Sequence, residues 1–245
     1  MMRFDLISLF PQMFQALTEF GITRRAFEKQ LVTLNHWHPR DYTHDRHKTV
    51  DDRPFGGGPG MVMMYPPLQA AFEAIDKDLP ATQPSHRVYL SPQGRPLTQA
   101  KLKALAKRPQ LTLLCGRYEG IDERVLEHYI DEEISVGDFV VSGGELPAMM
   151  LMDGLIRLLP GALGHQASAQ EDSFADGLLD CPHYTRPATV AGSTVPSVLQ
   201  SGDHAKIAQW RFCQQQQVTQ KKRPDLWAQW LARHESDNSD STSGP

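Results

Sequence analysis

The chain has 245 residues, a length that suits one large domain with a small one, or two modest domains. Hydrophobic residues make up 40% and charged residues 22%, which is typical of a soluble globular protein. Its formal net charge of -4 gives no global argument for nucleic-acid binding, so any RNA contact must come from a local basic surface. The three cysteines are widely spaced, which argues against a disulfide framework. The sequence shows no signal-peptide pattern and no apolar run long enough to span a membrane, so we expect a soluble cytoplasmic protein.

The first 160 residues alternate between strand-like and helix-like segments. Strands are predicted at Phe4–Phe10, Arg87–Leu90, Leu111–Cys115, Glu133–Val136 and Phe139–Val141. Helices are predicted to begin at Pro11 and to span Gln99–Lys107 after the N-cap Thr98, Ile121–Tyr129, and Ala148–Leu159 with Pro147 in its first turn. This alternation predicts an α/β fold whose mainly parallel sheet is covered by helices on both faces.

The composition changes after residue 161, where Gly, Ser, Ala, Gln and acidic residues replace the apolar pattern. We therefore expect four regions: an α/β domain over 1–161, a linker over 162–177, a small helical domain over 178–233 and a disordered tail over 234–245. Within the helical domain, Asp203 is the expected cap of a helix His204–Gln216, and Pro224 opens a helix Asp225–Ala232.

Three glycine- or proline-containing loops follow predicted strands, over residues 89–94, 115–120 and 136–147. In open α/β sheets, ligands bind beyond the carboxyl ends of the strands, and glycines there let the backbone approach a ligand closely. No G-x-x-x-x-G-K-[ST] and no helix-opening G-x-G-x-x-G is present, which disfavours a phosphate-binding loop or a dinucleotide site. Spacing alone is equally compatible with ordinary turns between strands and helices.

Other polar residues are not specific by pattern. Arg157 is typical of a surface partner for Asp153 one turn earlier, and Asp172 of a solvated loop carboxylate. Four histidines between residues 36 and 47 show no H-E-x-x-H motif, which favours polar loop residues over a metal site. The basic run Lys221-Lys222-Arg223 fits a phosphate backbone, although such a run more often simply faces solvent.

Several motifs together resemble the bacterial tRNA (guanine-N1)-methyltransferase family of the SPOUT superfamily. They occur in order from residue 7 to about residue 225, and in combination they are highly specific. The resembling stretches are Ile7–Pro11, His44–His47, Val50–Met64, Tyr89–Gly94, Cys115–Arg124, Gly137–Pro147, Glu171–Pro187 and Ser201–Ala205.

This resemblance implies a trefoil-knotted parallel sheet domain, an exception to the rule that chains avoid knots, followed by a helical tRNA-binding domain. It also implies a homodimer whose active site is shared between subunits. The S-adenosyl-L-methionine site would use the three loops: Tyr89, Leu90, Ser91, Pro92, Gly116, Arg117, Tyr118, Glu119, Ser135, Val136, Gly137, Asp138, Phe139, Val140, Val141, Gly143, Gly144 and Pro147. Phe139 and Val141 stand where relatives commonly carry Tyr and Leu.

The implied reaction is methylation of N1 of the guanine at position 37, directly 3′ of the anticodon. The family's catalytic pair corresponds to Asp172, as the general base that removes the N1 proton, and Arg157, which would stabilise negative charge developing on guanine O6. His47 and Asp51 would contact neighbouring bases of the anticodon stem-loop. The resemblance also admits a magnesium requirement, but the sequence contains no ligand cluster that supports one.

Three alternatives differ from this interpretation. Another SPOUT-type methyltransferase would act on a different RNA base, but the run Glu171-Asp172-Ser173-Phe174 belongs to the guanine-N1 family's motif. A non-catalytic RNA-binding protein would be favoured by loss of Asp172 or Arg157, and both are present. A nucleotide-binding regulator could use the same loops, but it would not need a basic helical domain.

Overall fold

The computed structural model describes residues 1–80, 82, 84–164 and 172–240, the last six without their side chains. Contacts within the chain divide it into two compact units, Met1–Gly164 and His165–Pro245. The division falls close to residue 161, where the composition changes. Residues 165–171 of the predicted linker and 241–245 of the predicted tail lie outside the described residues.

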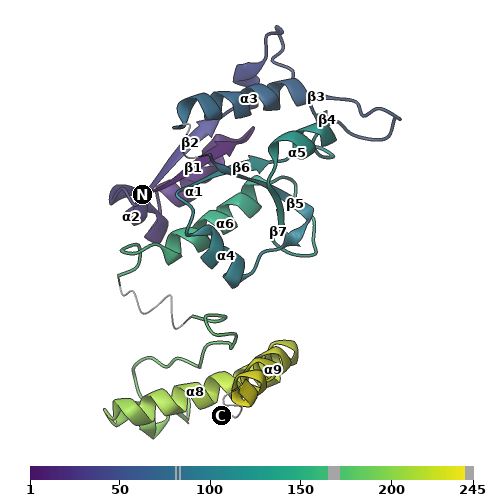
Figure 1. Ribbon diagram of the computed structural model, residues 1–245. Helices are drawn as coiled ribbons and strands as arrows, with labels where there is room; N and C mark the ends of the chain where they lie inside the picture. Colours follow the sequence, from purple (N-terminus) through teal and green to yellow (C-terminus); the bar gives the residue numbers. More distant parts are fainter. Residues whose placement is uncertain (81, 83, 165–171, 241–245) are drawn as a thin grey trace. The chain divides into compact units, whose positions relative to one another are not determined.

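The first unit is built on a five-stranded sheet in the order β2-β1-β6-β5-β7, and every pairing in it is parallel (Figure 1). Its strands are β1 (Met2–Ile7), β2 (Val32–Trp37), β5 (His86–Pro96), β6 (Gln110–Cys115) and β7 (Glu132–Ser135). Four of the predicted strands are therefore confirmed, while β2 was not predicted. The knot that the family resemblance implies remains a prediction.

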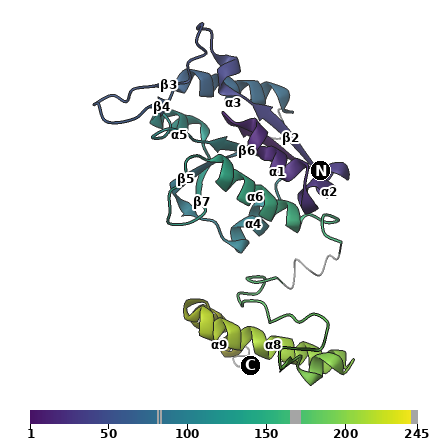
Figure 2. The same ribbon diagram turned by 180° about the vertical axis from the view of Figure 1, so that it is seen from behind.

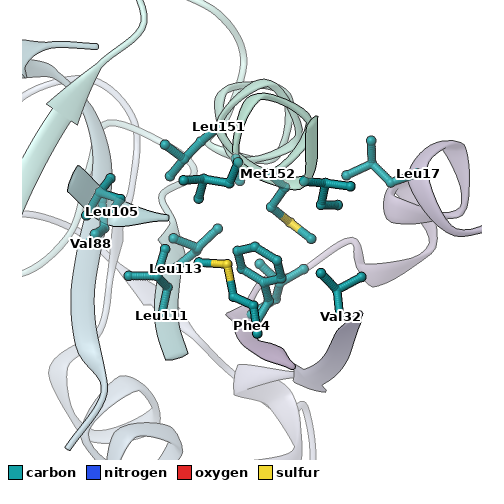
Figure 3. Close-up of a cluster of buried hydrophobic side chains, with 14 of the residues drawn as sticks. Phe4, Leu17, Val32, Val88, Leu105, Leu111, Leu113, Leu151 and Met152 are labelled. Atoms are coloured by element: carbon teal, nitrogen blue, oxygen red, sulfur yellow. The ribbon is translucent and has the colours of Figure 1, made fainter. Parts of the chain in front are cut away.

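Helices cover both faces of this sheet, as the opposite views of Figures 1 and 2 show. On one face lie α1 (Gln15–Thr18), α2 (Gly21–Glu28), α4 (Gln99–Leu105) and α6 (Glu145–Leu158), and on the other α3 (Tyr65–Asp78) and α5 (Glu123–Tyr129). Successive residues of a strand point to opposite faces, so Leu113 packs in one core and Leu114 in the other. Figure 3 shows the α6 side, where Leu151 and Met152 pack above Phe4.

The helix starts follow the signals in the sequence. The Thr98 hydroxyl accepts the backbone N–H of Lys101 at 3.2 Å, which confirms Thr98 as the N-cap of α4. Pro147 lies in the first turn of α6, as predicted, although that helix begins at Glu145. The remaining short elements of this unit are η1 (Pro11–Phe14), η2 (Pro39–Tyr42), β3 (Asp51–Asp52) and β4 (Val62–Met63).

The predicted strand Phe139–Val141 is wrong, because these residues form an irregular loop after β7. Phe139 and Val140 are exposed, and no strand in the described part of the chain pairs with them. Apolar and β-branched residues favour a strand only where pairing and burial reward them, and this loop has neither.

The second unit contains a two-stranded hairpin, β8 (Thr189–Val190) with β9 (Ser193–Thr194), then η3 (Ser197–Gln200), α8 (His204–Lys222) and α9 (Pro224–Asp240). The Asp203 cap is confirmed, since its carboxylate accepts the backbone N–H of Lys206 at 3.1 Å. Both helices outrun their predicted ends, and α9 enters the segment expected to lack structure from residue 234. Extending a formed helix fixes one residue per added hydrogen bond, so polar residues prolong it at little cost.

Among the helices of the described residues, none is long and apolar enough to cross a lipid bilayer.

Candidate functional site

One cavity lies where the carboxyl ends of β5, β6 and β7 meet, and the three loops selected from the sequence line it together. All the predicted cofactor-binding residues except Asp138 line this cavity. Three lining residues were not predicted: Gly120, Ile134 and Ser142. Gly120 and Ser142 lie inside the predicted loops but were not selected as contacts, and Ile134 lies on β7 directly before the predicted Ser135.

Close packing between two of the loops depends on glycine. The backbone N–H of Gly144 donates to the carbonyl oxygen of Gly116 at 2.9 Å. A Cβ on Gly144 would lie 2.7 Å from the Cα of Cys115, which is a backbone atom and cannot move aside cheaply. The second and third loops can therefore approach each other only because residue 144 has no side chain.

Tyr89 forms the floor of the first loop and is only 8% exposed. Burial, and to a lesser extent the carboxylates of Glu133 and Glu123, raises the pKa of Tyr89 to about 12. Its hydroxyl lies against Gly116, where a Cβ would be only 2.8 Å away. Tyr89 thus stays neutral and supports the backbone of the neighbouring loop.

The third loop is held by a local turn. The Ser135 hydroxyl accepts the backbone N–H of Gly137 at 3.2 Å and donates to the Gly137 carbonyl oxygen at 3.0 Å. Gly137 has a φ of 151°, and a Cβ there would lie 2.7 Å from the Phe139 ring. The turn consequently folds Phe139 back over Gly137 beside the cavity.

The two predicted catalytic residues lie in different units. Arg157 is half-buried near the end of α6, in the first unit, as predicted from the sequence. Asp172 is half-buried in the second unit, where it lines a cavity with Asp180, His183 and Arg211. Their meeting at one active site therefore remains a prediction.

The two predicted RNA contacts lie close together in the chain but differ in surroundings. Asp51 starts β3 and pairs with Met63. The pKa of Tyr118 is raised mainly by burial and further by the Asp51 carboxylate, which places Asp51 beside the second cavity loop. His47 is exposed in a turn, where its backbone N–H donates to the Asp45 carboxylate at 3.0 Å.

The glycine-rich segment of residues 53–61 also contacts the site. The backbone N–H of Glu119 donates to the carbonyl oxygen of Met61 at 2.9 Å. A Cβ on Gly60 would lie 2.4 Å from the Glu119 side chain. Residues 60 and 61 thus brace Glu119 at the cavity, a contact between distant segments that no local pattern reveals.

Within the described residues, Asp180, Cys181 and His183 form a group whose possible ligand atoms all lie within 4.8 Å of one another. His183 and Asp180 already bond each other at 2.8 Å, and burial raises the pKa of the Cys181 thiol. Magnesium prefers oxygen ligands, so a thiol and an imidazole do not suit it. This group accordingly gives no support to a magnesium site.

The sequence is similar, over most of its length, to proteins of one known family. Residues 2–229 match the family model described as "tRNA (Guanine-1)-methyltransferase TrmD". The chain is 64% identical to the tRNA (guanine-N(1)-)-methyltransferase of Hydrogenovibrio crunogenus, over 95% of this chain and 98% of that protein. It is 59% identical to the enzyme of the same name from Ralstonia nicotianae, over 92% and 86% of the two chains. It is 57% identical to the enzyme of that name from Pasteurella multocida, over 92% of this chain and 91% of that protein.

Proposed function

Given that this chain belongs to the tRNA (guanine-1)-methyltransferase family, we propose that it methylates the guanine directly 3′ of the anticodon, at the cavity beyond β5, β6 and β7. The chain is an S-adenosylmethionine-dependent enzyme that methylates N1 of guanine in tRNA. The proposal assigns the binding sites of the cofactor and the tRNA and the residues that catalyse methyl transfer.

The cavity suits the cofactor, and the meeting of three loops around it is the observation that carries the proposal. Apolar residues such as Leu90, Ile134 and Val141 offer flat contact for an adenine ring, and the glycines of the second and third loops expose backbone polar groups. S-adenosylmethionine supplies an electrophilic methyl group on its sulfonium when bound. The chain's own task is to hold it and present the guanine.

Asp172 acts as the general base in this proposal. Guanine N1 carries a proton and is a poor nucleophile until that proton leaves, so a carboxylate must accept it as N1 attacks the methyl carbon in line. Arg157 donates to guanine O6, where negative charge develops as the proton departs. A carboxylate is a weak base, which is why the reaction needs both groups.

The tRNA is held by two parts of the chain. His47 and Asp51 contact bases next to the target guanine, and the position of Asp51 beside Tyr118 in the cavity loop supports this. The second unit grips the backbone with the exposed basic residues of α8, namely Lys206, Arg211, Lys221 and Lys222. The target guanine leaves the anticodon-loop stack, which costs less in a single-stranded loop than in a duplex.

A homodimer completes the site in this proposal. Leu146 and Met150 on α6 are about half exposed, although the same helix buries most of its other apolar residues. Both lie one turn apart beside the cavity residue Pro147, so they form an apolar patch that a second copy would cover. As the family resemblance implies, the Asp172 of that copy would complete the site. Because its substrate is tRNA, we place the enzyme in the cytoplasm.

The family resemblance admits a magnesium requirement. The described residues hold no group of three carboxylates beside the cavity, so a magnesium ion would be held by one or two carboxylates, such as that of Glu119, together with RNA phosphates. Methyl transfer measured with EDTA against added Mg²⁺ decides this point. Unchanged rates with EDTA would exclude a magnesium requirement, and a loss of transfer that added Mg²⁺ restores would establish one.

The decisive test measures methyl transfer from labelled S-adenosylmethionine to two tRNA transcripts that differ only in G or A 3′ of the anticodon. Transfer to the G transcript alone is expected. Equal transfer to both would contradict the target base, and transfer to neither, with the cofactor still bound, would contradict the target position.

A further inference from the structure

A buried carboxylate that lies outside the cavity links the second and third loops. Glu145, the first residue of α6, is 0% exposed. Its carboxylate accepts the Ser8 hydroxyl at 2.7 Å and the Nε–H of Arg117 at 2.8 Å. Glu145 does not line the cavity, whereas Arg117 does.

The carboxylate is stable in this buried position for two reasons. It lies in the first turn of a helix, where the backbone dipole favours negative charge. It also has a hydrogen-bond donor for each oxygen, one of them charged, which offsets the cost of removing it from water. Removing its charge would leave the Arg117 guanidinium largely buried beside a neutral group.

Arg117 in turn fixes the spacing of the cavity walls. Its Nη1 donates to the carbonyl oxygen of Ser142 at 3.1 Å, and its guanidinium lies 4.4 Å from the centroid of the Phe10 ring. The side chain passes so close to Gly143 that a Cβ there would be 2.2 Å from Nε. One arginine side chain thus ties the second loop to the third loop and to the segment after β1.

We propose that Glu145 is a positioning residue for S-adenosylmethionine, which acts through Arg117 by holding the second and third loops at the separation that fits the cofactor. This inference rests on the proposed cofactor site. In this proposal Glu145 is necessary for cofactor affinity but not for the methyl-transfer step. Glu145 does not line the cavity, and its side-chain hydrogen bonds go to Ser8 and Arg117, not to the two proposed catalytic residues.

The test is Glu145→Gln, which keeps the side-chain shape and removes its charge. Calorimetry should show the Kd for S-adenosylmethionine rising about tenfold or more, with KM for the cofactor rising in parallel. At saturating cofactor, kcat should fall by less than about threefold. A large loss of kcat with an unchanged Kd would overturn the inference.

Asp5→Asn is the matched control. Asp5 is also 0% exposed and pairs with an arginine, Arg3, at 2.8 Å, but it does not line the cavity. It should lower the melting temperature while leaving the Kd for the cofactor within about twofold of wild type. If both variants weaken cofactor binding equally at equal loss of stability, Glu145 is merely structural and the inference fails.

A second variant guards against misfolding of Glu145→Gln. Ser8→Ala removes one hydrogen bond to Glu145 and should raise the Kd by about threefold to tenfold. An unchanged Kd in Ser8→Ala, with Glu145→Gln unfolded, would also reject the inference. Failure of the wild-type protein to bind S-adenosylmethionine would instead reject the proposed cofactor site itself.

Discussion

Arg157 and Asp172 show how much a single residue's meaning depends on its surroundings. By pattern alone, one is typical of a surface arginine and the other of a solvated carboxylate. The family match covers both positions. Their proposed roles have a chemical reason, since removing the N1 proton of guanine requires a base and a partner for the charge on O6. Their assignment is therefore testable one residue at a time.

Asp172→Asn should lower kcat by about a hundredfold to ten-thousandfold, because the amide cannot accept the N1 proton. Single-turnover methyl transfer to the G transcript measures this, and the Kd for S-adenosylmethionine should stay within about twofold. Asp176→Asn is the control, since it removes a carboxylate from the same segment, where Asp176 caps the backbone N–H of Leu178. Identical pH–rate profiles for wild type and Asp172→Asn would show that Asp172 is not the base.

Tyr89 predicts a pH dependence of stability. Its folded-state pKa is raised to about 12 from an ordinary value of 10.0, mainly by burial. The contribution of neutral Tyr89 to the free energy of unfolding is fully present below pH 10. It is lost as the pH rises from 10 to 12, because in that range Tyr89 ionises readily only in the unfolded chain. The free energy of unfolding should fall by roughly 2–3 kcal/mol across this range.

Urea unfolding at several alkaline pH values measures the effect. Tyr89→Phe cannot ionise, so its free energy of unfolding should fall less steeply than that of wild type over the same range. Parallel slopes for the two proteins would show that Tyr89 is not the group responsible.

Among the elements, the strand ends and the loops after them decide the site. β5, β6 and β7 are adjacent and parallel, so the loops that follow them converge on one cavity. Close backbone packing then sets the separation of the loops, as the contact of Gly144 with Cys115 and Gly116 shows.

Gly144→Ala should weaken S-adenosylmethionine binding by about tenfold or more, because the new Cβ would collide with the Cα of Cys115 and push the loops apart. Isothermal calorimetry measures the Kd. Gly164→Ala is the matched control, since nothing lies within 4 Å of a Cβ there. Wild-type affinity in Gly144→Ala would mean that the loop spacing does not govern cofactor binding.

For the whole molecule, the proposed active site draws on residues from both units of the chain. The cavity and Arg157 belong to the first unit, and Asp172 belongs to the second. The proposed dimer joins them by letting the Asp172 of one copy serve the cavity of the other, with the exposed Leu146 and Met150 as the proposed contact surface.

Mixing two impaired variants tests this sharing, at a cofactor concentration between the Kd of wild type and that of Gly144→Ala. Asp172→Asn has an intact cavity and Gly144→Ala has an intact base, so their heterodimer contains one complete site if sites are shared. Co-refolded equal mixtures should regain up to about a quarter of wild-type activity, since about half of the dimers are mixed and each has one good site of two. No gain over the separate variants, with dimers present by light scattering, would show that each copy uses its own Asp172.

The sequence by itself determined the α/β class, four of the five strands of the main sheet, the caps at Thr98 and Asp203, and the three loops of the site. These features depend on local periodicity, on capping hydrogen bonds and on glycine, all of which act within a few residues. The family motifs, spread along most of the chain, added the reaction and the prediction of Asp172 and Arg157 as the catalytic pair.

Only the tertiary structure decided the rest. The buried bonds of Glu145 to Ser8 and Arg117, the bracing of Glu119 by residues 60 and 61, and the absence of a strand at Phe139–Val141 all depend on which distant segments become neighbours. A hydrogen bond across more than a hundred residues leaves no periodic signal, and a strand forms only where a partner edge exists. Local patterns therefore placed the loops of the site, and the packing of the sheet determined what holds them together.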